Sequence, residues 1–132
     1  MRHEEDELQR ACIRWFDLVR PEYSLLLHHS PNGGFRNAGE AAKFKGMGTR
    51  AGFPDLILLL SRCGYHALAV EMKTPQGRQS ARQQQWQAAA EQNGILYATI
   101  RTLDDFIALL SAYIDSDRRT LMHYEKLNTH KQ

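Results

Sequence analysis

The sequence predicts an α/β fold in which helices flank a mixed central β-sheet. The apolar run at the start of an expected strand, Leu56 to Ser61, is typical of a strand buried on both faces. Residues Tyr65 to Lys73 form the returning strand of a hairpin, because Arg62-Cys63-Gly64 between them reads as a turn. An expected helix separates this hairpin from another strand, Ile95 to Ile100, and such a strand-helix-strand crossover gives parallel pairing.

The elements before the hairpin follow from apolar spacing and from helix-breaking residues. Apolar side chains recur every three or four residues over 4–19, which predicts a helix that Pro21 ends. Tyr23 to His28 is expected to form a short strand, and the proline and glycines of residues 30–34 predict a loop. Residues 37–46 are then expected to form a short helix.

The elements after the hairpin are two helices around the last strand. Residues 80–93 predict a helix with Ser80 as its N-cap. Residues 103–113 have the apolar spacing of an amphipathic helix. We therefore expect one domain over residues 1–114, followed by a polar, basic and loosely ordered tail over 115–132.

Composition excludes some classes of protein and leaves others open. The 132 residues carry 17 Lys and Arg against 15 Asp and Glu, so the net charge of +2 says little about partners. No apolar run approaches the roughly 20 residues of a membrane helix, and the acidic amino-terminal residues do not resemble a signal peptide. Cys12 and Cys63 lack metal-binding spacing, so we expect reduced thiols in a soluble, cytoplasmic protein.

Two acids and a lysine are predicted to meet on the hairpin. Asp55 lies as many residues before Cys63 as Glu71 lies after it, so a hairpin folded about Cys63 places them on facing strands. Directly opposed residues have Cβ atoms about 4.5–5.5 Å apart. Lys73 lies two positions beyond Glu71 and points to the same side of the sheet. The alternative is an ordinary exposed pair at a strand end beside an ordinary turn residue.

This arrangement suits the hydrolysis of a phosphodiester. Two neighbouring carboxylates repel each other, and a hard divalent cation relieves that repulsion while it accepts oxygen ligands. The backbone carbonyl of Met72 is a further candidate ligand. We therefore expect Mg²⁺, with Mn²⁺ able to substitute, and we expect Lys73 to orient the attacking water or to stabilise developing negative charge.

Several segments together resemble the VRR-NUC (virus-type replication-repair nuclease) family of the PD-(D/E)xK nucleases. Each matches a motif of that family, and the motifs occur in the family's order over most of residues 4–110. The segments are Glu5-Asp6-Glu7-Leu8-Gln9, His29-Ser30-Pro31-Asn32, the glycine-rich residues 46–56 with Asp55, Glu71-Met72-Lys73, and residues 77–83 ending in Gln83.

The resemblance implies a restriction-endonuclease-like core and a role for each matching residue. Asp55 and Glu71 would be metal ligands, Lys73 the catalytic lysine, and Gln83 an active-site helper. Glu5 would reach the site from the first helix and is a possible further ligand, although Glu4 and Glu7 compete for that role, as Gln84 and Gln85 compete with Gln83. The expected DNA contacts are Asn32, Arg36, Lys43, Lys45, Arg50 and Arg78.

The resemblance also implies a substrate and an assembly. Free-standing members of the family act as homodimers on branched DNA, so we expect a structure-selective endonuclease for Holliday junctions or flaps. One alternative is a sequence-specific restriction-type nuclease, for which no base-reading element is apparent. The other is a DNA-binding accessory module without catalysis. Trp15 and Trp86 lie at core positions of their helices and are expected to pack rather than to stack on bases.

Overall fold

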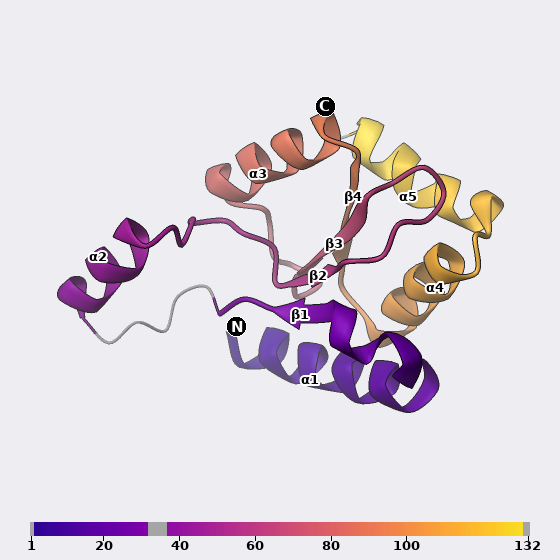
Figure 1. Ribbon diagram of the computed structural model, residues 1–132, viewed down its shortest axis with the longest axis horizontal. Coiled ribbons are helices and arrows are strands. Elements are labelled where there is room, and N and C mark those ends of the chain that lie inside the picture. Colours follow the sequence, from indigo (N-terminus) through magenta and orange to yellow (C-terminus); the bar gives the residue numbers. More distant parts are fainter. Residues whose placement is uncertain (1, 32–36, 131–132) are drawn as a thin grey trace.

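A mixed sheet with strand order β1-β2-β3-β4 forms the centre of the protein, as the computed structural model in Figure 1 shows for residues 2–31 and 37–130. The strands are β1 (Leu27–His29), β2 (Leu56–Leu58), β3 (Ala67–Met72) and β4 (Ile95–Ile100). The first three pair antiparallel, and β3 pairs parallel with β4. The predicted α/β class and mixed sheet are therefore confirmed.

Helices cover both faces of the sheet. Helices α1 (Arg2–Val19), α4 (Leu103–Ile114) and α5 (Arg118–His130) contribute to one large apolar cluster with the side chains of β2 and β3 that point to that face. Helix α3 (Ala81–Gln92) packs on the opposite face, where Ala69 and Tyr97 meet Ala90. All six residues of β3 are buried, as its central position requires.

The expected strand Tyr23 to His28 was wrong over most of its length. Pro21–Leu26 forms a 3-10 helix, η1, and only Leu27–His29 pairs with β2. Pro21 occupies the first turn of η1, where its fixed φ angle favours a helical start, and the amide of Tyr23 donates to the carbonyl of Arg20. Strand β2 is also shorter than predicted, because Leu59 leaves the ladder and is 59% exposed.

Residues Arg118–His130 of the expected loose tail form a helix, which corrects that expectation. Helix α5 starts after Asp117, whose carboxylate accepts hydrogen bonds from the amide and the hydroxyl of Thr120. Leu121 and Tyr124 are buried and belong to the main core cluster. The two buried residues lie three positions apart on one face of the helix, so residues 118–127 pack on the domain.

The helix caps and the two cysteines can also be compared with the sequence predictions. Ser80 caps α3 as expected, and helix α2 (Ala38–Gly46) is capped by the side chain of Asn37 and has no buried residue. Cys12 and Cys63 are both free thiols. The part of the chain that the structure describes contains no helix long and apolar enough to cross a membrane.

Candidate active site

The hairpin of β2 and β3 has the predicted register. Leu56 faces Val70 and Leu58 faces Leu68, so the next pair along the hairpin is Asp55 and Glu71. The tip is a two-residue turn, Cys63-Gly64, with φ angles of 55° and 85°. Positive φ at both central positions is typical of the turn whose twist matches a tight hairpin. Asp55 and Glu71 therefore lie across from each other on the face of the sheet that α3 covers.

Asp55 is held by two hydrogen bonds at the point where β2 begins. Its Oδ2 atom accepts a hydrogen bond from the amide of Met72 at 2.6 Å. Its backbone carbonyl lies 2.8 Å from Nδ1 of His29, which donates to it. The carboxylate of Asp55 is thus fixed against β3, and its backbone is fixed against β1.

Glu71 is fully buried and is oriented by β4. The hydroxyl of Tyr97 donates to Oε1 of Glu71 at 2.5 Å, and the hydroxyl of Thr99 lies 3.4 Å from Oε2. Burial raises the pKa of Tyr97, and the charge of Glu71 raises it further, so this phenol keeps its proton and donates it. Sequence reasoning missed Tyr97, because its meeting with Glu71 depends on the parallel register of β3 and β4.

Burial and the neighbouring carboxylates disfavour the charged form of Asp55. Burial raises the pKa of Asp55 above its ordinary value, the hydrogen bond from Met72 opposes that shift, and the charges of Glu71 and Glu5 raise the pKa further. His29 lowers it. Negative charge at this end of the hairpin is therefore unfavourable in the absence of a cation, which is the condition that favours cation binding.

Glu5 is the acid of the first helix that acts on this site. It is half-buried, whereas Glu4 and Glu7 are exposed. Glu7 forms an ion pair with His3 at 3.1 Å, one turn away on the surface. The charge of Glu5 acts on Asp55, so the structure brings Glu5 toward the hairpin carboxylates and leaves Glu4 and Glu7 in solvent.

Lys73 follows the last residue of β3 and lies beside the carboxylates without pairing with them. Its amide donates to the carbonyl of Ile100 at 3.0 Å, which fixes its backbone. Its side chain passes close to Gly77, where an added Cβ would lie 3.4 Å from Cδ of Lys73. Within residues 2–31 and 37–130, no ion pair joins the ammonium of Lys73 to Asp55 or to Glu71.

Gln83 has a structural role in this conformation. Its side-chain oxygen accepts a hydrogen bond from the amide of Ser80 at 2.8 Å, and its own amide donates to the Ser80 hydroxyl. This reciprocal capping box begins α3. The glutamine that hydrogen-bonds Tyr97 is Gln79, whose side-chain amide also donates to Oε1 of Gln87 at 2.7 Å. Gln84 and Gln85 are exposed.

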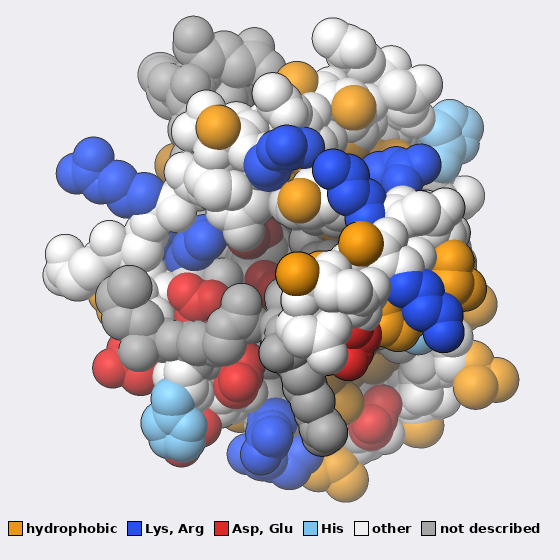
Figure 2. All heavy atoms as spheres, turned by 90° about the vertical axis from the view of Figure 1, so that its left-hand side faces the viewer, with side chains coloured by type: hydrophobic (Ala, Val, Ile, Leu, Met, Phe, Trp, Pro, Cys, Tyr) orange, Lys and Arg blue, Asp and Glu red, His pale blue; other side chains and the backbone are white. Residues whose placement is uncertain are grey.

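The predicted basic DNA contacts that the structure describes are all on the surface. Lys43 and Lys45 on α2, with Arg50 and Arg78 in loops, are exposed. Asn32 and Arg36 lie outside the residues that the structure describes. Figure 2 shows acidic side chains gathered in the middle and lower part of this face, with Lys and Arg mostly across its upper part. Such a division places attraction for phosphate next to the carboxylates.

The oxygen donors at this site suit a hard divalent cation. Within the described residues, no three His, Cys, Asp or Glu side chains form a group that could hold a metal ion. Asp55 and Glu71 supply two carboxylates, and the carbonyl of Met72 points the same way as its amide, which faces Asp55. Mg²⁺ keeps several waters and is usually held by one or two carboxylates, so this donor set fits it.

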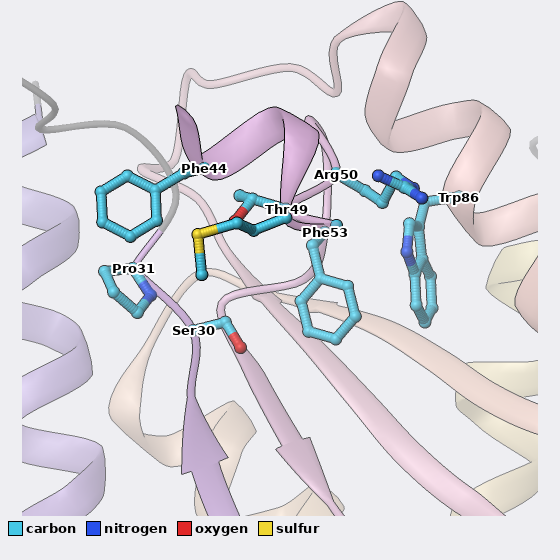
Figure 3. Close-up of a pocket in the computed structure, with 9 residues that line it drawn as sticks. Ser30, Pro31, Phe44, Thr49, Arg50, Phe53 and Trp86 are labelled. Atoms are coloured by element: carbon cyan, nitrogen blue, oxygen red, sulfur yellow. The ribbon is translucent and has the colours of Figure 1, made fainter. Parts of the chain in front are cut away.

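A pocket of about 580 Å³ lies next to the carboxylates, between α2, α3 and the end of β1. Its walls carry the rings of Phe44, Phe53 and Trp86, with Arg50 at the edge (Figure 3). Phe53 and Trp86 meet edge to face, with ring centroids 4.9 Å apart. Sequence reasoning did not find this pocket, because its walls come from segments far apart in the chain.

Comparisons with known proteins agree with this geometry. The family model described as VRR-NUC domain matches residues 3–102. A solved structure named "VRR_NUC domain protein" is 30% identical and superposes with a TM-score of 0.74, over 84% of this chain and 88% of that chain. No curated protein matches the chain.

Proposed function

Because this chain belongs to the VRR-NUC family, a family of nuclease domains, we propose that it is a metal-dependent, structure-selective endodeoxyribonuclease. The family resemblance of the sequence motifs is confirmed. The observation that carries the proposal is the meeting of Asp55 and Glu71 at the open end of the hairpin, beside the unpaired ammonium of Lys73.

Magnesium is the cofactor that we propose. Asp55, Glu71 and the carbonyl of Met72 would hold it, with Glu5 as a further carboxylate from α1. Bound Mg²⁺, or Mn²⁺ in its place, supplies a water of lowered pKa and offsets the charge that develops on the phosphate. The mutual repulsion of these carboxylates favours the bound state.

The side chains of the protein would have three further roles in the reaction. Lys73 would hold the attacking water or the developing negative charge, which is supported by its position two residues after Glu71 and by the absence of an ion pair with Asp55 or Glu71 among the described residues. Tyr97 orients Glu71 through a hydrogen bond of 2.5 Å and therefore acts as a positioning residue. Lys43, Lys45, Arg50 and Arg78 would attract the DNA backbone, because they are exposed cations.

We further propose a homodimer that acts on branched DNA. Leu18 and Leu25 are 82% and 98% exposed, at the end of α1 and in the contacting η1, and a second copy would cover them. Two active sites related by a two-fold axis suit a junction that presents two equivalent strands. A monomer at micromolar concentration with DNA bound, observed by sedimentation, would rule out paired incision.

Cleavage of a labelled four-way junction and of its matched linear duplex tests the proposal. Wild type, Lys73→Ala and the control Lys126→Ala, an exposed lysine of α5, are each incubated with Mg²⁺, Mn²⁺ or EDTA. We expect metal-dependent cutting of the junction by wild type and the control, with at least a hundredfold loss in Lys73→Ala. Equal cutting of both substrates would keep the nuclease and reject the junction preference. Binding without cutting would favour an accessory module.

A further inference from the structure

The pocket beside the active site has the chemistry of a nucleobase site. Its volume of about 580 Å³ lies within the range of small-ligand sites and is far too small for a duplex or a folded partner. Phe44, Phe53 and Trp86 supply aromatic surface, and Ser30 and Thr49 supply hydroxyl groups (Figure 3). Bases stack on aromatic side chains, and hydroxyl groups at the rim can bond to their polar edges.

Charge at the pocket points to a ligand that also carries phosphate. Arg50 lines the pocket and is exposed, and Lys43 and Lys45 lie exposed on α2, the helix that carries Phe44. None of the described residues that line it is acidic. An aromatic pocket with a basic edge is complementary to a nucleotide, whereas an apolar pocket for a lipid or a leucine-rich peptide would not require these cations.

The position of the pocket ties it to the scissile phosphate. Phe53 precedes Asp55 by two residues, so their Cα atoms are at most about 7 Å apart, roughly the rise of two nucleotides along one strand. On the other wall, Trp86 lies against Tyr97 with ring centroids 6.2 Å apart, and Tyr97 donates to Glu71. The pocket wall and the metal-ligand candidates are therefore neighbours through direct contacts.

We propose that this pocket receives one unpaired nucleobase of the DNA, within about two nucleotides of the bond that is cut. The inference rests on the proposed nuclease function and adds a specificity to it. A base in continuous duplex is stacked and paired, and its removal costs energy, whereas the base next to the branch of a flap or a splayed-arm duplex is already unpaired. A branched substrate therefore fills the pocket at lower cost than a linear duplex, which accounts for structure selection without base-specific contacts.

The first test measures base binding without cleavage. Trp15 packs edge-on against Phe106 in the core on the other side of the sheet, so Trp15→Phe leaves Trp86 as the reporter of the pocket. We expect thymidine and deoxyadenosine monophosphates to quench Trp86 fluorescence in a saturable manner in EDTA. Inorganic phosphate is the control and should not quench, because it lacks a base to stack.

The second test compares DNA substrates. A splayed-arm duplex with a normal base at the branch is titrated in EDTA against the same duplex with an abasic residue there. For wild type we expect the abasic substrate to bind about 5- to 150-fold more weakly, the effect of losing one stacked base. In Phe53→Ala this ratio should fall to near one. In Met122→Ala, a half-exposed apolar residue of α5, the ratio should stay at the wild-type value.

The outcomes separate this inference from the proposed function. Equal affinity of wild type for both duplexes, with no mononucleotide quenching, overturns the base pocket even where the junction is cut with Mg²⁺. Mononucleotide quenching and a base-dependent affinity, with no cleavage of any DNA, would support the pocket and reject the nuclease. The wild-type comparison needs no variant, so it stands even if Phe53→Ala fails to fold.

Discussion

Replacement of Gly52 by alanine should destabilise the protein more than a replacement at any unobstructed turn glycine. Gly52 lies between Arg50 and Phe53, two residues that line the pocket, and has a φ angle of +84°. A Cβ atom there would lie 2.6 Å from the carbonyl carbon and 2.7 Å from the carbonyl oxygen of Arg82, in the first turn of α3. Backbone atoms cannot rotate away as a side chain can, so the loop and α3 must separate.

Two costs add in Gly52→Ala. The left-handed backbone costs a non-glycine residue about 1–2 kcal/mol. The forced separation from Arg82 resembles overpacking of a core, which costs about 1–3 kcal/mol. We therefore expect the free energy of unfolding to fall by about 2–5 kcal/mol, measured by equilibrium urea denaturation.

Gly64→Ala is the matched control. Gly64 has nearly the same φ angle, +85°, in the hairpin tip, and a Cβ atom there meets nothing within 4 Å. Its loss should be limited to the backbone cost of about 1–2 kcal/mol. If both variants lose the same free energy, the close approach of Gly52 to α3 carries no cost.

Three further predictions concern the site and the core. Burial and neighbouring charge raise the pKa of Asp55, so the folded state binds the proton of this carboxyl more tightly than the unfolded state does. The stability gained from that proton is present below the ordinary pKa of aspartate and is lost as the pH rises through the raised pKa. Asp55→Asn should therefore raise the urea midpoint at pH 7 in EDTA while it abolishes cleavage, and an unchanged or lower midpoint would contradict this. Tyr97→Phe should weaken Mg²⁺ binding about 10- to 100-fold, read from the Mg²⁺ dependence of cleavage, whereas Tyr113→Phe, which loses a hydrogen bond to the carbonyl of Leu60, should not. Leu121→Ala should cost about 2–5 kcal/mol in urea denaturation, against less than about 0.5 kcal/mol for the half-exposed Leu127→Ala; similar losses would mean that α5 is not part of the core.

The hairpin and its carboxylates could be predicted because their signals are local. The residues between Asp55 and Glu71 are few, and the observed pairing of Leu56 with Val70 is the one centred on Cys63. The tip pairs Arg62 with Tyr65, so its register differs from that of the strands by one residue. Strand β4 was predicted with its observed ends, since Gly94 and the polar Arg101 bound an apolar run. In such segments the spacing of apolar residues, the turn residues and the burial all favour the same structure.

The features of the fold and the site that were not predicted depend on contacts between distant segments. Tyr97 meets Glu71 only through the register of two parallel strands joined by a helix, which no local pattern encodes. Helix α5 was missed because its polar composition outweighed two apolar residues, Leu121 and Tyr124, whose packing stabilises it. Gln83 matched a family motif, and its capping of Ser80 follows from the same spacing. One pattern therefore fits both a structural role and a catalytic one.

The hydrogen bond from the Met72 amide to Asp55 makes one proton a reporter of the whole site. The ladder of β2 begins at Leu56, so a carboxylate takes the place of a backbone carbonyl as the partner of this amide. In the free protein that amide should exchange slowly with deuterated solvent, at the rate of the core strand around it. A cation that draws the carboxylate of Asp55 toward itself weakens that hydrogen bond. The nuclear magnetic resonance signal of the Met72 amide would then report the binding of the cation without any cleavage of DNA.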